Sequence, residues 1–425
     1  MRTILHVDLN SFFATAQQQT NPRLRGKPVG IIKAHGRTCV IAASVEAKRY
    51  GVKTGTDVFE AKKLCPHIIF IPAEFDKYAD ISMRFIDICS TYSPTCEVFS
   101  LDECFVDVTD SEKIFGGVLN IALEIKRRLR EEIGDWMTCS VGISHNKVLA
   151  KLAGEQIKPD GLYVITPETI YDVLDKSELM DVCGLGWALD RHLRQLGIDS
   201  FPKLRKKSLE FLHKHFGPFW SVHLYNIGRG IDNSPVIAIP EIPDAKSVGR
   251  TYTTHRNLTS KSEILTLVRN LCEEAACKAR QMKLAGRYVA ISLQGGSIRN
   301  SSEGWWGHRT LKNYIDDGKR FFDLCVEISK DWPFFHQDKP VFAGQSYVRF
   351  CGVTLAMLTK KDYLTTPLFP TDRRRMDLIK SVDEVNSRYG HYSVFPGQLL
   401  GMPIIMPEVN GYFGDKKFRL NFLHQ

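Results

Sequence analysis

Acidic side chains at two predicted strand ends are the residues of this chain most able to do chemistry. Asp8 lies in the segment HVDLNSFF, where a short apolar strand gives way to a predicted helix. Asp102 and Glu103 lie between two further predicted strands, at 95–99 and 104–108. Each group alone has an ordinary explanation, because an aspartate before a helix commonly caps it and a loop acidic pair is commonly only hydrated. Together, three carboxylates from adjacent strand ends are what two Mg²⁺ ions need to clamp an attacking hydroxyl and a leaving phosphate.

A bend between Asp102 and Glu103 is a requirement of this hypothesis. Neighbouring side chains on a regular strand point to opposite faces, so both carboxylates reach one metal cluster only if the chain turns between them. We therefore predict a turn at this acidic pair, at the corner between the two strands.

A third motif is basic. The segment SVGISHNKVLAK at 140–151, continuing to KPDG at 158–161, predicts a strand, a turn and a helix that ends before Pro-Gly. One interpretation is a purely structural helix. The other is a lysine delivered from the helix end to a triphosphate, whose negative charge the metal ions leave partly uncompensated.

The elements that must position these motifs follow an α+β order. Strand, helix, strand, strand, helix, strand is predicted, with the helices at 75–92 and 117–132 and the last strand at 138–143. This is the order of a ferredoxin-like split β-α-β sheet, a scaffold that hosts many functions. Short strands at 28–32 and 39–43, with short helices after them, predict a small lobe inserted after the first strand.

A proline-rich segment separates this part from the rest of the chain. Residues 166–232 show helical patterns, whereas SPVIAIPEIPD at 234–244 carries three prolines and predicts an interdomain linker. A second domain follows, with strands predicted at 246–254, 288–293 and 347–355 and helices at 261–282, 311–331 and 372–389.

The composition is that of an ordinary folded protein. Hydrophobic residues make up 43% and charged residues 25%, which excludes collagen-like, coiled-coil and wholly disordered chains, and no apolar run is long enough to predict a membrane span. The first residues lack a signal-peptide pattern, and eleven cysteines without a Cys-x-x-Cys pair suit reduced thiols, so we expect a cytoplasmic protein. The net charge of +9 is concentrated in residues 246–358, with 17 basic against 10 acidic residues, which is compatible with a polyanionic partner.

Six segments occur in an order and spacing that match one known family. They are HVDLNSFFA at 6–14, SVEAKRYGVKTG at 44–55, SLDECFVDVT at 100–109, SVGISHNKVLAKLA at 140–153 with KPDG at 158–161, CGLGWALDRHLRQLGI at 183–198 and KSVGRTYT at 246–253. On these motifs the sequence resembles the Y-family translesion DNA polymerases, in particular the DNA polymerase IV branch. The resemblance covers roughly residues 1–357.

The resemblance implies a multidomain right-hand polymerase that extends a primer 3′ end with dNTPs at low fidelity during DNA repair. Its parts would be a ferredoxin-like palm, small fingers, a helical thumb with a helix-hairpin-helix and an α/β little finger. The corresponding ranges are 1–13 and 74–165 for the palm, 14–73 for the fingers, 166–232 for the thumb, 233–245 for the linker, 246–358 for the little finger and 359–425 for a C-terminal extension. We expect a monomer that acts on primer-template DNA at the nucleoid.

The family's catalytic roles fall on residues already singled out. The resemblance implies that Asp8 and Asp102 bridge two Mg²⁺ ions, for which Mn²⁺ is an alternative, that Glu103 binds the metal facing the primer 3′-OH, and that the Leu9 carbonyl completes the second site. The family's steric gate falls on Phe13, whose ring would exclude a ribose 2′-hydroxyl. The alternative for Phe13 is a plain core residue.

The triphosphate is expected at the backbone amides of Ser11, Phe12 and the gate residue, together with Lys48 and Lys158. Two positions of the nucleotide site depart from the family pattern, since Val45 stands where tyrosine is common and Lys48 where arginine is common. The first change removes a hydroxyl donor, and the second replaces a bidentate fork by a point charge. We therefore expect weaker triphosphate binding or a compensating group elsewhere.

Three further positions differ from the family pattern. Asn10 and Gln17 stand where acidic residues are frequent, and Cys104 stands where alanine is usual. None of these changes removes a proposed metal ligand.

DNA contacts are expected from the C-terminal half of the chain. Gly184 and Gly186 resemble a helix-hairpin-helix, in which glycines let backbone N–H groups approach a phosphate, although a helix-terminating turn uses the same residues. The little finger offers arginines at or near its predicted strands, each of which could equally form a surface ion pair: Arg250, Arg256, Arg299 and Arg349. The pair Trp305-Trp306 could stack on a base or pack locally.

The C-terminal extension holds one further candidate site. YLTTPLF at 363–369 resembles the short apolar segments by which such polymerases dock on a sliding clamp, but it lacks the leading glutamine. Two rival functions stay open at this stage. One is another nucleotidyl transferase or cyclase on the same palm, for which the glycine hairpin and basic domain would have no use. The other is a noncatalytic DNA-binding scaffold, whose signature would be lost carboxylates.

Overall fold

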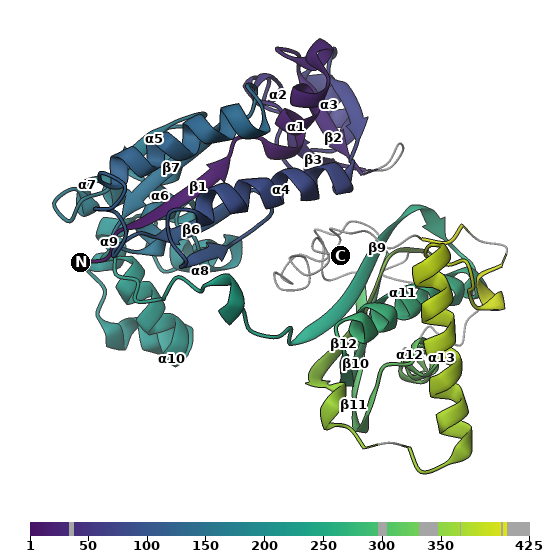
Figure 1. The fold of residues 1–425 in the computed structure, drawn as a ribbon. Helices are drawn as coiled ribbons and strands as arrows, with labels where there is room; N and C mark the ends of the chain where they lie inside the picture. Colours follow the sequence, from purple (N-terminus) through teal and green to yellow (C-terminus); the bar gives the residue numbers. More distant parts are fainter. Residues whose placement is uncertain (34–37, 296–303, 331–346, 366, 401–402, 406–425) are drawn as a thin grey trace. The chain divides into compact units, whose positions relative to one another are not determined.

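The chain forms two compact units in a computed structural model (Figure 1). The structure describes residues 1–33, 38–295, 304–330, 347–365, 367–400 and 403–405. Unit 1 comprises the described residues up to Ile242, and unit 2 comprises those from Pro243 onward. The boundary falls inside the proline-rich segment predicted as a linker, where the only regular structure described is a short 3-10 helix, Ile239–Glu241.

A five-stranded sheet lies at the centre of unit 1. Its strand order is β5-β6-β1-β7-β8, and β1 pairs antiparallel with both β6 and β7. The strands are β1 (Ile4–Leu9), β5 (Cys96–Val98), β6 (Glu103–Asp107), β7 (Cys139–Ser144) and β8 (Leu162–Val164). This topology confirms the predicted split β-α-β sheet, to which β8 adds an edge strand that was not predicted.

Helices cover both faces of this sheet, and the alternation of residues along β1 shows which face is which. Leu5, Val7 and Leu9 pack in a core with α4 (Phe75–Ser90) and α5 (Val118–Arg128). The intervening residues Ile4, His6 and Asp8 therefore point to the other face, where α6 (Lys147–Gln156) packs against β1 and β7. The helix predicted at 117–132 is α5 followed by one π-helical turn, Leu129–Ile133.

The small lobe is a three-stranded sheet with short helices. Its strand order is β3-β2-β4, formed by β2 (Val29–Ile32), β3 (Val40–Ala43) and β4 (Ile69–Pro72), the last of which was not predicted. The helices are α1 (Phe12–Thr20), a 3-10 turn at Pro22–Leu24, α2 (Val45–Arg49) and α3 (Val58–Leu64). α2 begins where the Ser44 hydroxyl accepts a hydrogen bond from the Ala47 N–H at 3.2 Å.

The last part of unit 1 is helical and has its own apolar core. Its helices are α7 (Ile170–Lys176), a 3-10 turn at Leu179–Asp181, α8 (Trp187–Gln195), α9 (Phe201–Arg205) and α10 (Leu209–Ile227). α10 is kinked where Gly217 adopts a positive φ of 74° before Pro218.

Unit 2 is an antiparallel four-stranded sheet with helices packed on one face. The strand order is β11-β10-β12-β9, and α11 (Lys261–Gln281) and α12 (Gly318–Ser329) share an apolar core with the sheet. The strands are β9 (Ser247–Leu258), β10 (Leu284–Gln294), β11 (Gly304–Ile315) and β12 (Val348–Lys360). The helix α13 (Pro370–Tyr389) follows a 3-10 turn at Lys361–Tyr363 and precedes another at Gly397–Leu399.

One predicted element of unit 2 is wrong. The helix predicted at 311–331 begins only at Gly318, because residues 304–315 form the edge strand β11. Trp305 and Leu311 point into the core in a two-residue alternation that the surrounding glycines and serines conceal in the sequence. Asp317 starts the helix by accepting a hydrogen bond from the Lys319 N–H at 2.8 Å.

Within the described part of the chain, no helix combines the length and the apolar character needed to cross a membrane.

Candidate active site

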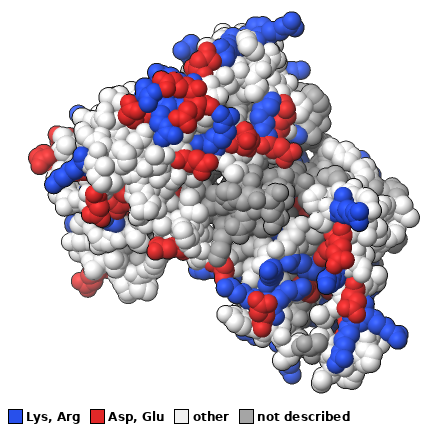
Figure 2. All heavy atoms as spheres, in the orientation of Figure 1, with Lys and Arg blue, Asp and Glu red and all other residues white. Residues whose placement is uncertain are grey.

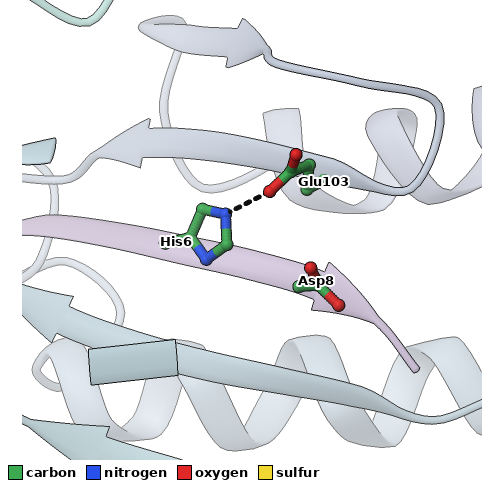
Figure 3. Close-up of side chains that lie close together, drawn as sticks. All are labelled: His6, Asp8 and Glu103. Carbon is green, nitrogen blue, oxygen red and sulfur yellow. Dashed lines mark hydrogen bonds and ion pairs between the residues drawn. The ribbon is translucent and has the colours of Figure 1, made fainter. Parts of the chain in front are cut away.

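The register between β1 and β6 brings two of the predicted carboxylates together. Asp8 is the direct cross-strand partner of Glu103, and His6 is the partner of Phe105. Because residues two apart share a face, His6, Asp8 and Glu103 lie on one side of the sheet (Figure 3), and one ligand atom of each lies within 4.8 Å of the others. His6 donates or accepts through Nε2, which lies 2.8 Å from Glu103 Oε2.

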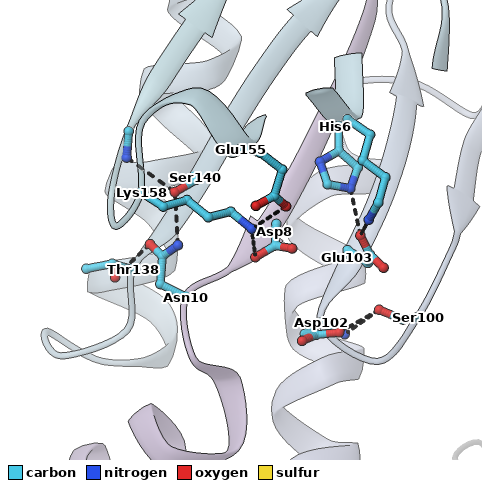
Figure 4. A network of polar contacts seen from close by, with 12 residues as sticks. His6, Asp8, Asn10, Ser100, Asp102, Glu103, Thr138, Ser140, Glu155 and Lys158 are labelled. Atoms are coloured by element: carbon cyan, nitrogen blue, oxygen red, sulfur yellow. Dashed lines mark hydrogen bonds and ion pairs between the residues drawn. The ribbon is translucent and has the colours of Figure 1, made fainter. Parts of the chain in front are cut away.

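The predicted turn at the acidic pair is present. Asp102 lies in a bend, and Glu103 is the first residue of β6. The Asp102 carbonyl accepts a hydrogen bond from the Leu9 N–H at 2.8 Å, and its carboxylate accepts one from the Ser100 hydroxyl at 2.5 Å. The turn thus ties the third carboxylate to the end of β1, beside Asp8 and Glu103 (Figure 4).

The three carboxyl groups are shifted in different directions. Burial, opposed by Lys158 and aided by the charges of Asp102 and Glu103, raises the pKa of Asp8 to about 7. Burial also raises the pKa of Asp102, against the hydrogen bond from Ser100. Burial acts in the same sense on Glu103, but the hydrogen bond from His6 and the charge of Lys151 lower its pKa to about 2.

Two lysines, one from α6 and one from the turn after it, neutralise part of this charge. Figure 4 shows the second, Lys158, with its contacts to Asp8 and Glu155. Lys151 donates to Glu103 Oε2, and Lys158 Nζ lies 3.4 Å from Asp8 Oδ1 and 2.6 Å from Glu155 Oε1. The nearby carboxylates raise the pKa of Lys158 against the opposing effect of burial. The predicted lysine from the end of the basic helix is therefore present at the acidic site.

The side chain of Asn10 organises the backbone beneath Lys158. Its amide nitrogen donates to the Ser140 hydroxyl at 2.9 Å, and its carbonyl oxygen accepts from the Thr138 hydroxyl at 3.1 Å and from the Asp160 N–H at 2.7 Å. Asn10 is buried, so these bonds replace the water that the amide would otherwise bind. Lys126 holds the same turn from below through the Asp160 carboxylate at 2.6 Å.

The start of α1 lies directly after β1. Ser11, the residue before the helix, adopts a left-handed φ of 50°, and its buried hydroxyl has no hydrogen-bond partner among the described residues. The first N–H groups of a helix have no intrahelical acceptor, so this turn offers donors next to Asp8. Phe13 is half-buried and stacks on Tyr78, with ring centroids 4.3 Å apart, and it also contacts Phe75. Phe13 thus packs against the core and stays partly exposed.

Val45 and Lys48 lie on α2, in the small lobe. Val45 is half-buried at the first turn, and Lys48 lies in the last turn. Burial lowers the pKa of Lys48, the charge of Lys158 adds to this effect, and Asp8 opposes it. Lys48 is therefore within electrostatic range of Asp8 and Lys158.

Three residues of this arrangement were not predicted as site residues: His6, Lys151 and Glu155. His6 lies two residues before Asp8, and the two-residue period of a strand places both on one face, so this signal was present in the sequence. Lys151 and Glu155 approach through the packing of α6 on the sheet, which no local pattern reports.

The donor set suits a hard divalent cation. Carboxylate oxygens are the ligands that Mg²⁺ prefers, and a cation bound at Asp8 and Glu103 would offset the repulsion between carboxylates that, together with burial, raises the pKa of Asp8. The residues present therefore fit the metal ions expected from the sequence.

The glycine hairpin begins α8. Gly184 adopts a positive φ of 99°, and a Cβ there would lie 3.0 Å from His223 Nε2. A Cβ at Gly186 would meet nothing within 4 Å, so the backbone before α8 is open to approach. This geometry is compatible with the expected phosphate contact.

The expectation for Arg250 is wrong. Its side chain is 4% exposed, and its Nε lies 2.8 Å from a carboxylate oxygen of Glu274 on α11, so the guanidinium is buried in an ion pair and is not exposed to a phosphate. Arg256 is exposed and pairs with Glu263. Arg349 is half-buried, and its Nε has no hydrogen-bond partner among the described residues. Arg299 lies outside the described residues.

The charged surface and the pair Trp305-Trp306 were both candidates for contact with DNA. On the face drawn in Figure 2, basic and acidic side chains lie next to one another. In unit 2 some basic side chains form ion pairs, such as Arg309 with Glu327 and Lys319 with Asp323. Trp305 packs against the apolar core. Trp306 is 57% exposed and stacks on His308, with ring centroids 4.6 Å apart. The local-packing interpretation therefore holds for Trp305.

The candidate clamp segment, 363–369, is accessible where it is described. Tyr363, Leu368 and Phe369 are all exposed, and residue 366 lies outside the described part of the chain.

Comparisons with known proteins agree with the fold and the site. The impB/mucB/samB family model matches residues 7–155, the C-terminal domain model of that family matches residues 245–368, and the model described as the DNA polymerase-iota thumb domain matches residues 180–232. DNA polymerase IV of Moorella thermoacetica is 35% identical over 393 residues, which cover 91% of this chain and 94% of the relative. DNA polymerase IV of Gluconobacter oxydans is 36% identical, over 84% of this chain and 94% of the relative.

The solved structure of a Y-family DNA polymerase chimera has the same fold, with a TM-score of 0.69 at 24% identity, and the match covers 84% of this chain and 99% of that one. The architecture is accordingly a multidomain palm, fingers, thumb and little finger, and the protein is a DNA-directed DNA polymerase. The chain belongs to the Y family of DNA polymerases, in the DNA polymerase IV branch.

Proposed function

We propose that this polymerase adds dNTPs to a primer 3′ end by two-metal, in-line phosphoryl transfer. Asp8, Asp102 and Glu103 would hold two Mg²⁺ ions, with the Leu9 carbonyl as a further ligand. The observation that carries the proposal is the cross-strand pairing of Asp8 with Glu103 beside the turn that holds Asp102. When bound, the metal ions would supply Lewis acidity at the phosphate and lower the pKa of the primer hydroxyl.

The chain's own residues would bind and orient the nucleotide. Lys158 and Lys48 are the cations nearest the acidic site, and the N–H groups at the start of α1 supply neutral donors for the triphosphate. The accessible part of the Phe13 ring would lie against the sugar and exclude a 2′-hydroxyl. Small side chains at Ala42 and Ala43 in the small lobe would leave room above the nascent base pair, which favours lesion bypass at low fidelity.

The thumb and the little finger would hold the DNA, and the palm would carry out the reaction. The hairpin at Gly184 and Gly186 would contact a phosphate through its backbone, and Arg256 and Arg349 stay candidates for contacts in the little finger. We further propose that the exposed segment 363–369 docks on a sliding clamp and that the monomeric enzyme acts at the nucleoid.

Primer extension tests the proposal. Wild type should extend a labelled primer on a template with Mg²⁺ and the complementary dNTP, and Asp102→Ala should lose this activity while keeping DNA affinity. Glu131→Ala is a matched control, because Glu131 is an exposed acidic residue that pairs with Arg127 on the surface. A wild type that binds the duplex but extends nothing under Mg²⁺ or Mn²⁺ would favour the noncatalytic scaffold.

A further inference from the structure

His6 carries the buried polar group to which the proposed reaction assigns no task. Its side chain is fully buried in β1, and its Nε2 lies 2.8 Å from Glu103 Oε2, whereas Nδ1 has no hydrogen-bond partner among the described residues. A leucine or phenylalanine would fill comparable space without burying an unpaired nitrogen. Burying the imidazole therefore lowers stability relative to an apolar side chain of similar size, so packing alone does not explain a histidine at this position.

The surroundings of His6 hold its ring in one orientation. The ring centroid lies 4.8 Å from that of Phe105, and α6 packs closely where two glycines permit it. A Cβ at Gly154 would lie 3.0 Å from His6 Nδ1, and one at Gly142 would lie 2.1 Å from the Ala150 carbonyl oxygen. With the helix this close to the strand, the imidazole has no room to swing away.

The hydrogen-bond pattern also determines which nitrogen carries the proton. Because an ionised carboxylate oxygen can only accept, the 2.8 Å contact requires Nε2 to carry the proton and donate to Glu103 Oε2, which leaves Nδ1 as the nitrogen with no partner among the described residues. Lys151 donates to the same oxygen. Both bonds end on one carboxylate oxygen, so they orient Glu103 and leave its other oxygen outside these two contacts.

We propose that His6 is a positioning residue, which holds the Glu103 carboxylate beside Asp8 in the orientation that a divalent cation requires. The inference rests on the proposed function, because it acts through a carboxylate that would bind metal there. His6 would not itself be a ligand, since its Nε2 proton points at the carboxylate and its Nδ1 lies against α6. Groups that orient a metal ligand in this way commonly change metal affinity or activity by about 10- to 100-fold when they are removed.

Three substitutions at this position separate positioning from packing. Glutamine can place its amide nitrogen near the site of Nε2, asparagine places it nearer Nδ1, and leucine offers no donor. In single-turnover primer extension across a Mg²⁺ titration, we expect His6→Leu and His6→Asn to lower the maximal rate by about tenfold or more and to raise the half-activating Mg²⁺ concentration. His6→Gln should restore most of both values, and all three should bind primer-template DNA as wild type does.

Folding and coupling controls make each outcome decisive. Thermal unfolding of each variant in EDTA shows whether the fold survives, and only folded variants enter the comparison. If folded His6→Leu matches wild type, or if folded His6→Gln fails as His6→Leu does, the positioning role is overturned. In a Glu103→Ala background, adding His6→Leu should cause no further loss of the residual rate, and a further loss as large as in wild type would also overturn it. A wild type inactive in every metal would instead refute the proposed function.

Discussion

Asp8 and Glu103 are direct partners on adjacent antiparallel strands, yet the pKa values of their carboxyl groups are shifted in opposite directions. Glu103 receives hydrogen bonds from His6 and Lys151, whereas the nearest cation to Asp8 in the network, Lys158, lies 3.4 Å away. The charge of Glu103 is thus compensated by two donors of the protein, whereas Asp8 has only the longer contact with Lys158 and is the carboxylate that a metal ion would compensate.

Removing the charge of Asp8 should stabilise the metal-free protein and abolish catalysis. Asparagine matches aspartate in size but carries no buried charge beside Asp102 and Glu103, so we expect the Tm of Asp8→Asn in EDTA at pH 8 to exceed that of wild type. Mg²⁺ should raise the Tm of wild type and not of the variant, because binding to the folded state stabilises it. Thermal unfolding measures both, and equal Tm values in EDTA would contradict the expectation.

Truncating Phe13 should open the nucleotide site to ribonucleotides. Phe13→Ala is expected to incorporate rNTPs in primer extension and to lose about 2–4 kcal/mol of stability, because the ring stacks on Tyr78. Phe75→Ala is the matched control, since Phe75 belongs to the same aromatic cluster. It should lose stability without gaining rNTP use, and rNTP use by both variants would show that loosened packing is the cause.

Loss of the Asn10 amide should disturb Lys158 through the backbone. Asn10→Ala removes three side-chain hydrogen bonds from a buried or partly buried network and should cost about 1–3 kcal/mol of unfolding free energy, with a raised KM for dNTP. Denaturant unfolding and steady-state extension measure the two effects. Ser140→Ala removes one of these partners and should fall between the variant and wild type. If Asn10→Ala is destabilised but keeps the KM of wild type for dNTP, the turn that Asn10 holds has no effect on nucleotide binding, and the prediction is wrong.

Restoring the family pattern on α2 should tighten nucleotide binding. We expect Val45→Tyr together with Lys48→Arg to lower the KM for dNTP with little change in kcat, because a hydroxyl donor and a bidentate cation are added near the triphosphate. Steady-state kinetics on one primer-template provides the measurement. An unchanged KM would show that another group already compensates.

Acid should weaken the contact between α13 and α12 within unit 2. Asp317 caps α12 and pairs with Arg375 on α13, and although burial raises its pKa, the Arg375 contact outweighs burial and lowers it. A carboxyl group whose folded pKa lies below its unfolded value stabilises the fold above the unfolded value, near pH 4, and this contribution is lost as the pH falls through the folded value.

We therefore expect Asp317→Asn, which can still cap α12, to lose up to about 1 kcal/mol at pH 7 and less at pH 3. Urea unfolding at the two pH values measures the difference. Asp317→Ala removes the cap as well and should lose more at both. Equal losses for Asp317→Asn at pH 7 and pH 3 would argue against the ion pair.

Local patterns in the sequence determined much of this protein. The alternation of β1 and the three-to-four-residue spacing of α4 and α11 predicted those elements, because each of them buries one face and its apolar residues recur with the period of the element. The turn at Asp102 was predictable because two neighbouring carboxylates reach one face only across a bend. The candidate carboxylates and lysines were likewise identified by type and position.

Only the tertiary structure decided which residues surround each group. The hydrogen bond from His6 to Glu103 depends on the register of β6 against β1, and the bond from Lys151 depends on how α6 packs on the sheet; neither is encoded by neighbours in sequence. Arg250 was expected at the surface, but its place on the core face of β9 opposite Glu274 turns a candidate DNA contact into a buried ion pair. Local periodicity specifies a face, whereas the partner on that face is set by contacts between segments far apart in the chain.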